Sequence, residues 1–112
     1  MADYCAETDI ESALGITIDE NSIPSSDEVS DFITRAQGMI NAEAKVSSDM
    51  TDTYGELKSI AIDLVLKMVN NMWSYRYPDV FPYLDIELTS EQKRIIHKAH
   101  HKFAGKSWEL GG

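Results

Sequence analysis

Three histidines near the end of the chain are the residues best suited to chemistry. His97 and His101 are four residues apart, and His100 lies between them. On a helix this spacing puts His97 and His101 on one face, where two imidazoles could bind the same metal ion. However, the nearest preceding carboxylate is Glu91, and the single cysteine, Cys5, lies far away. Because a metal site needs three or four placed ligands, we interpret the histidines as part of a solvated, basic helix face.

The sequence shows none of the common catalytic patterns. Its carboxylates are scattered, and no two of them lie within an apolar stretch as an acid–base pair would. Its serines stand outside any nucleophile-elbow motif, and its isolated glycines form no phosphate-binding loop. Cys5 has no basic residue close to it in the sequence that would activate its thiol. We therefore expect that the protein is not an enzyme and uses no metal and no cofactor.

Aromatic residues gather around Pro78 and Pro82. Five rings fall within eleven positions: Trp73, Tyr75, Tyr77, Phe81 and Tyr83. In a small helical domain some of these rings are expected to complete the core, while the others act as rigid anchors of the kind enriched at protein interfaces. Trp108 follows the expected end of the last helix at Gly105, so it either packs back on the chain or inserts into a neighbouring protein.

Four helices are predicted to position these residues, because apolar residues recur at helical spacing in four stretches. The stretches are 8–15, about 26–46, about 53–74 and about 90–104. Each begins with two residues at the spacing of a capping box: Thr8 and Glu11, Ser25 and Glu28, Thr53 and Glu56, and Thr89 and Gln92. Gly15 is suited to the left-handed position that ends the first helix.

The third predicted helix, 53–74, is apolar around most of its circumference, so we expect it to be the central helix of the domain. The two prolines exclude a regular helix directly after it. Residues 105–112 are expected to form a short, extended tail. The sequence therefore predicts an all-α bundle of a short N-terminal helix plus three longer helices, with a Pro- and aromatic-rich loop before the last one. Its 112 residues form a single domain with a core at about 8–104.

Charge is distributed unevenly along the chain, whose net charge is −9. Residues 89–112 contain five basic and two acidic side chains and so carry a net charge of +3, which leaves −12 on residues 1–88. The negative excess argues against a general nucleic-acid binder, because such proteins neutralise phosphates with Lys and Arg. The chain is therefore expected to have an acidic body and a basic end.

Membrane insertion and secretion are not expected either. No stretch approaches the roughly 18 apolar residues of a spanning helix, and the first residues, MADYCAETD, lack the basic and apolar regions of a signal peptide. With only one cysteine, Cys5, the chain can form no internal disulfide. We expect it to be made in a reducing cytoplasm.

The order of several short motifs resembles a known family. The motifs are Ala2-Asp3-Tyr4-Cys5, Leu14-Gly15-Ile16, Ile23-Pro24-Ser25, Val29-Ser30-Asp31-Phe32-Ile33-Thr34-Arg35-Ala36 and Met39-Ile40-Asn41. Over residues 2–46, and in the helix–loop–helix layout that continues to about 104, the chain resembles the small head–tail connector (head completion, adaptor) proteins of tailed viruses.

The resemblance implies a structural protein of the virion that assembles in the host cytoplasm. Its copies would form a ring, typically twelve-fold, beneath the portal protein and above a tail or stopper protein. DNA would pass through the channel without sequence-specific binding. The resemblance implies no enzymatic activity and no cofactor. The tail 106–112 matches the family in position rather than in sequence, so it does not by itself assign a portal-docking role to Trp108.

A ring requires two different surfaces on each subunit, and an acidic body with a basic last helix would supply them. We therefore predict that basic residues of the last helix face acidic residues of a neighbouring copy or of the portal, and that aromatic residues contribute the buried area. The predicted interface residues are Tyr75, Tyr77, Phe81, Tyr83, Lys93, Arg94, Lys98, Lys102 and Trp108.

Two other classes of function remain open at this stage. The first is a monomeric acidic protein-binding inhibitor or DNA mimic from a mobile element, which would suit the negative charge but would not need a basic final segment. The second is a small metal-dependent enzyme built on the helix of His97, His100 and His101.

Overall fold

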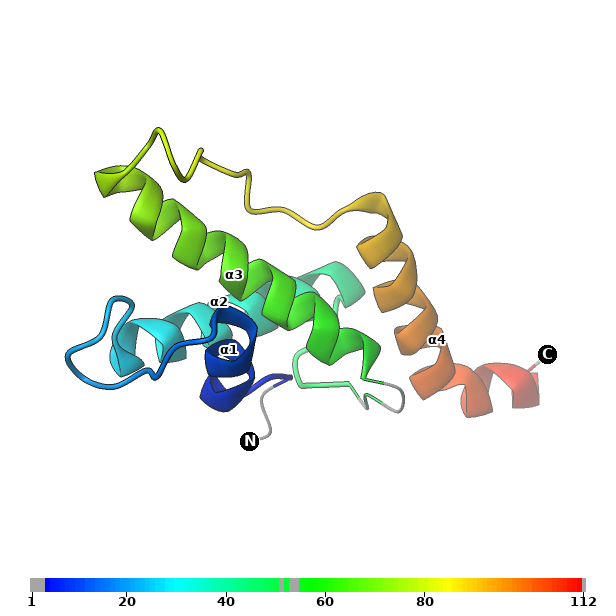
Figure 1. Ribbon diagram of the computed structural model, residues 1–112. Coiled ribbons are helices and arrows are strands. Elements are labelled where there is room, and N and C mark those ends of the chain that lie inside the picture. The colour runs from blue at the N-terminus through cyan, green and yellow to red at the C-terminus, as the bar shows by residue number, and fades with distance from the viewer. Residues whose placement is uncertain (1–3, 51, 53–54, 112) are drawn as a thin grey trace.

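Four helices make up the described part of the chain in the computed structural model, which describes residues 4–50, 52 and 55–111 and the side chains of these residues up to 100. The helices are α1 (Glu7–Leu14), α2 (Ser26–Ala44), α3 (Glu56–Arg76) and α4 (Ser90–Gly111), and no strand occurs in the residues described. The predicted all-α bundle, with one short and three longer helices, is confirmed (Figure 1).

The pair α2 and α3 forms the centre of the bundle, since each of them contacts the three other helices; the sequence predicted this place for α3. α3 packs along α2 and also contacts α1 and α4, and α4 lies across the far end of the α2–α3 pair (Figure 1). The molecule is elongated, with extents of 54 × 26 × 21 Å. Fully buried side chains of the core come from all four helices and include Ile10, Val29, Ile40, Leu57, Leu64, Val65, Val69 and Ile96.

Local capping residues explain where the first two helices begin and end. In α2, Ser25 and Glu28 form the predicted capping box: the Glu28 N–H donates to Ser25 Oγ at 3.3 Å and the Ser25 N–H donates to Glu28 Oε1 at 2.9 Å. α2 ends at Ala44 because Lys45 adopts a left-handed conformation with φ of 59°. Gly15 has the same role after α1, with φ of 70°, as predicted.

The predicted capping box of the first helix is wrong. α1 begins at Glu7, and its first turn is capped by Asp9, whose Oδ2 accepts the Ala6 N–H at 2.8 Å. Glu11 is not engaged at the helix start, because its Oε2 accepts the N–H of Ile18 at 2.7 Å in the following loop. Glu11 therefore fixes the connection to α2 rather than the start of α1.

The central helix begins later than predicted. α3 starts at Glu56, preceded by Gly55 with φ of 74°. The carboxylate of Asp52 accepts the N–H groups of Leu57 and Lys58 at 3.0 and 2.9 Å, so Asp52 supplies the cap. Thr53, the predicted capping residue, lies outside the described residues. The other end of α3 is Arg76, two residues beyond the prediction.

The last helix begins as predicted and is longer than predicted. Thr89 and Gln92 form a capping box, with the Gln92 N–H donating to Thr89 Oγ1 at 3.0 Å and the Thr89 N–H donating to Gln92 Oε1 at 2.9 Å. The backbone of α4 stays helical through Gly105 to Gly111. Figure 1 shows that this end of the chain reaches away from the other three helices, as a tail was expected to do, although its backbone is helical.

Candidate functional site

The segment that joins α3 to α4, residues 77–89, is held against α3 by two adjacent asparagines; we call it the connecting segment. Asn70 Nδ2 donates to the carbonyl of Pro82 at 2.8 Å. Asn71 Nδ2 donates to the carbonyl of Leu84 at 2.7 Å, while the Leu84 N–H donates to Asn71 Oδ1 at 2.8 Å. An irregular segment is thereby fixed along the helix that precedes it, so the positions of its side chains are defined.

Two of the clustered aromatic residues pack within the protein itself. The ring of Phe81 lies against that of Trp73, with centroids 5.1 Å apart and planes inclined at 50°. The Trp73 indole Nε1–H donates to the carbonyl of Ile23 at 3.2 Å, which ties the loop between α1 and α2 to the end of α3. The expectation that some of the rings complete the core is confirmed for Trp73, which packs against the core; Phe81 packs on Trp73.

The other three rings of the cluster face outward. Tyr75 is 91% exposed, Tyr77 56% and Tyr83 70%. Val80 and Leu84 beside them on the connecting segment are also exposed. We call this set of five side chains the aromatic end. Exposed apolar side chains gathered in this way mark a protein-binding surface more often than isolated ones do.

A shallow pocket opens at the same end of the molecule. Its volume is about 470 Å³, and it is lined by Ile23, Met72, Trp73, Tyr75, Arg76 and Tyr77. Ile23, Trp73 and the two tyrosines give it a mostly apolar wall, while Arg76 adds one charged group at the end of α3. A pocket of this kind suits an apolar anchor side chain from a partner protein.

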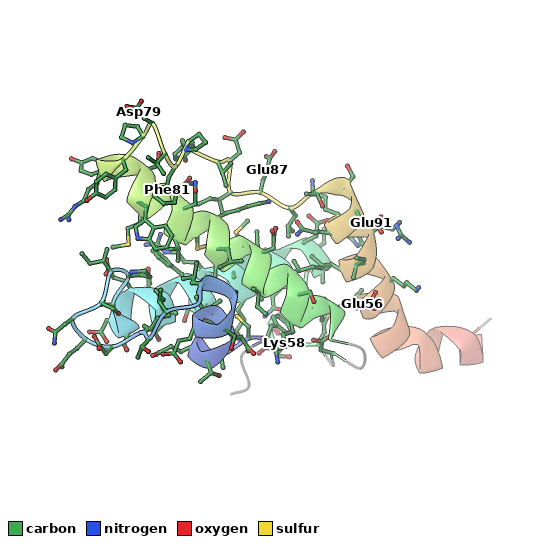
Figure 2. All side chains as sticks on the ribbon, in the orientation of Figure 1. Glu56, Lys58, Asp79, Phe81, Glu87 and Glu91 are labelled. Atoms are coloured by element: carbon green, nitrogen blue, oxygen red, sulfur yellow. The ribbon has the colours of Figure 1, made fainter. Side chains whose placement is uncertain are left out.

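Acidic groups lie next to the aromatic end. The connecting segment contains three acidic residues, Asp79, Asp85 and Glu87, and no basic one, and all three are exposed. Figure 2 shows Asp79 and Phe81 together near the end of α3, with Glu87 further along the segment towards α4. Ile86 and Leu88 alternate with Asp85 and Glu87 and pack on the core, so these two carboxylates are directed away from it.

The helix α4 carries the second candidate surface. Its residue Ile96 is fully buried against the core, and Ile95 and Ala99 are partly buried. Lys93, Arg94 and Lys98 are exposed; we call these three the basic face. The basic face is the outer side of a helix whose inner side is anchored in the bundle.

The residues of the basic face differ in their partners. Arg94 Nε donates to Glu91 Oε2 at 2.9 Å on the same helix, and Arg94 thereby holds the pKa of Glu91 below its usual value. Lys93 and Lys98 form no ion pair with any of the residues described. Within the described residues these two ammonium groups are therefore unpaired.

The histidines of α4 do not build a metal site within the described part of the chain. His97 Nε2 lies 2.7 Å from Glu43 Oε2, so it links α4 to the end of α2. Among the residues described, no group of three His, Cys, Asp or Glu side chains is placed to hold a metal ion. The side chain of His101 lies outside that description.

The two surfaces lie at opposite ends of the elongated molecule. Figure 1 shows the C-terminal end of α3, where the aromatic end is located, on the side of the bundle away from α4. The structure thus brings Tyr75, Tyr77 and Tyr83 together at one end and Lys93, Arg94 and Lys98 at the other. Phe81 lies near the tyrosines, but its ring packs on Trp73 instead of facing outward. The side chains of Lys102 and Trp108 fall outside the residues described.

Sequence reasoning missed the residues that shape the aromatic end. Asn70 and Asn71 fix the connecting segment, and Ile23 supplies both a carbonyl for Trp73 and a wall of the pocket. Two adjacent amides in an otherwise apolar helix were the available signal, because half-buried polar groups need hydrogen-bond partners. Nothing local in the sequence pointed to Ile23, which is fifty residues from Trp73.

Comparison with models of protein families, with curated proteins and with solved structures gave no match. Of the helices in the described part of the chain, none combines the length and the apolar character needed to cross a lipid bilayer.

Proposed function

We propose that this protein is a structural subunit of a viral head–tail connector, which assembles into a ring beneath the portal and extends the DNA channel towards the tail. The observation that supports this proposal best is the pair of unlike surfaces on one subunit. One surface is aromatic and acidic, and the other is basic. The sequence resemblance to connector proteins supports the same assignment.

Unlike surfaces suit a ring because a closed circle of identical subunits uses a heterologous contact, in which one patch meets a different patch of the next copy. A two-fold dimer would instead bury one self-complementary surface, in which residue i of one copy contacts residue j of the other and the reverse. The exposed tyrosines supply rigid contact area, and the charged groups set orientation and partner choice more than affinity. The overall charge of −9 also suits a channel, because an acidic wall repels phosphates and lets DNA slide past.

The proposal is tested by mixing the purified chain with purified portal rings of candidate tailed viruses and imaging the mixture by electron microscopy. We expect an additional ring of density on the tail side of the portal, made of several copies of the chain. A monomeric acidic inhibitor would bind its target as a single copy and would leave the portal rings bare. Bare rings for every portal encoded next to this chain would overturn the proposal.

A further inference from the structure

We infer that the contact between neighbouring copies joins the basic face of α4 in one copy to the aromatic end and connecting segment of the next. The inference rests on the proposed ring and names the two surfaces that meet in it. It commits to a second copy of this chain as the partner of both surfaces. Charge, hydrogen-bonding groups and the shape of the subunit all support this assignment.

Charge complementarity is the first reason. The connecting segment has three acidic residues and no basic one, so its net charge is −3. Residues 93–106 of the helix α4 have five basic residues and no acidic one, so their net charge is +5. No ion pair with another described residue is formed by Asp79, Asp85 and Glu87 on one surface or by Lys93 and Lys98 on the other. Each surface thus offers what the other lacks.

Unused hydrogen-bonding groups and aromatic faces are the second reason. Within the described part of the chain, the backbone carbonyls of residues 85–88 accept no hydrogen bond. A lysine ammonium carries three donors and no acceptor, so it can bond such carbonyls and a carboxylate at once. The exposed rings of Tyr75, Tyr77 and Tyr83 add faces that attract a cation. An acidic, carbonyl-rich and aromatic surface is therefore chemically matched to a lysine-bearing helix.

The shape of the subunit decides that the contact lies between copies. The aromatic end lies at the C-terminal end of α3, away from α4, whereas residues 85–89 of the connecting segment lead directly into α4. α4 is anchored in its own bundle by Ile96 and by the His97–Glu43 pair. The basic face cannot fold back onto its own aromatic end without leaving the core. Each copy therefore binds one neighbour with each end, and the contact propagates in one direction around the ring.

Charge exchange between two variants tests the contact. In K93E/K98E the basic face becomes acidic, and in D79K/E87K the acidic segment becomes basic; all four positions are exposed, so both variants should fold as the wild type does. Association of the full chain is followed by sedimentation equilibrium up to about 1 mM, a concentration that detects contacts of millimolar strength. Circular dichroism and thermal melting confirm folding.

The wild type is expected to associate reversibly beyond the dimer, and more weakly as the salt concentration rises. Each variant alone should associate on the order of tenfold more weakly, because like charges then face each other at both positions. An equimolar mixture of the two variants restores opposite charges at every contact, so it should recover association at the wild-type level. Charge reversals on the exposed surface of α2, R35E and D31K, serve as controls and should leave association unchanged.

Three results would overturn the inference: a wild type that stays monomeric at about 1 mM, variants that associate as the wild type does, or a mixture that stays as weak as its components. The contact between copies and the connector function can fail independently of each other. If K93E/K98E still forms rings on the portal, the connector function stands and another contact closes the ring. If the mixture recovers association but no portal binds the chain, the contact stands and the connector function fails.

Discussion

The side chain of Asn71 pairs with the backbone of Leu84 in both directions, since its Nδ2 donates to the Leu84 carbonyl at 2.7 Å and its Oδ1 accepts the Leu84 N–H at 2.8 Å. One amide thus imitates the pairing of a neighbouring strand. This contact joins α3 to the middle of the connecting segment, and the exposed tyrosines and acids on either side of Leu84 depend on it for their positions.

Replacement of Asn71 by leucine is expected to release the connecting segment. Both hydrogen bonds to Leu84 are lost while the size of the side chain is kept, so the free energy of unfolding should fall by about 1–3 kcal/mol. Hydrogen exchange should accelerate at the Leu84 amide far more than in α2. Asn21→Ala is the control, because its side chain forms no hydrogen bond within the described residues, and it should leave both quantities unchanged. Unchanged exchange at Leu84 in Asn71→Leu would contradict the role given to Asn71.

Replacement of Tyr4 by phenylalanine is expected to destabilise the fold by about 1–3 kcal/mol, because it leaves a buried N–H without an acceptor. The Tyr4 hydroxyl accepts the Met50 N–H at 2.8 Å and donates to Asn41 Oδ1 at 2.6 Å, and Tyr4 itself is buried. Urea unfolding measures the loss. Tyr75→Phe, which removes an exposed hydroxyl, is the matched control and should have almost no effect. Equal stability of the two variants would show that the Tyr4 contact is not important.

Asp9 should make the stability of the fold depend on pH. Its hydrogen bond from the Ala6 N–H, helped by Lys58, holds the pKa of Asp9 below the ordinary value of 3.8. A carboxyl with a lowered pKa stabilises the folded state above the ordinary pKa, and this contribution is lost as the pH falls through the lowered value.

Asp9→Asn keeps an acceptor for the Ala6 N–H but removes a charge that the start of α1 and Lys58 favour, so it is expected to cost about 0.3–1 kcal/mol at neutral pH. The difference from the wild type should shrink as the pH falls below 3.8, because Asp9 is then protonated in the wild type. Unfolding by urea at a series of pH values measures it. Glu20→Gln, at an exposed loop carboxylate, is the control for the loss of one negative charge. A constant difference between pH 7 and the acid range would refute this explanation.

The His97–Glu43 pair is expected to contribute modestly to the docking of α4 on α2. Both side chains are partly exposed, so a double-mutant cycle with His97→Ala and Glu43→Ala should give a coupling energy of about 0.2–1 kcal/mol. Hydrogen exchange in the first turns of α4 should rise in both single variants. Lys93 lies on the same helix and forms no ion pair with a described residue, so Lys93→Ala should leave the hydrogen exchange of α4 unchanged. A coupling energy of zero would mean that Ile96 and its neighbours hold α4 alone.

The parts of the fold that could be predicted from the sequence are those determined within a few residues. The capping boxes of α2 and α4 join residues three positions apart, and Gly15 is the obvious left-handed residue after α1. The start of α3 was misplaced because its cap, Asp52, bonds the N–H groups five and six residues ahead across Gly55. That geometry depends on the path of the loop, which local spacing does not reveal.

The residue types of the two surfaces could be predicted from the sequence, but which of their side chains are packed and which are exposed could not. The aromatic cluster and the basic helix were visible in the sequence, but the division of the cluster into the packed Phe81 and the exposed tyrosines was not. That division depends on Ile23, fifty residues before Trp73, and on the bonds of Asn70 and Asn71 to residues twelve and thirteen positions ahead. Tertiary contacts of this range leave no periodic signal.

The proposed contact between copies is tested most directly by cross-linking assembled protein made from equal amounts of ¹⁴N- and ¹⁵N-labelled chains. A zero-length carbodiimide joins a lysine amine to a carboxylate that it touches, and mass spectrometry then identifies the linked residues and their isotopes. We predict links from Lys93 or Lys98 to Asp79, Asp85 or Glu87 in which one peptide is light and the other heavy. The account would be contradicted if every such link joined two light or two heavy peptides. It would also be contradicted if Lys93 and Lys98 were linked to none of these acids in the assembled protein.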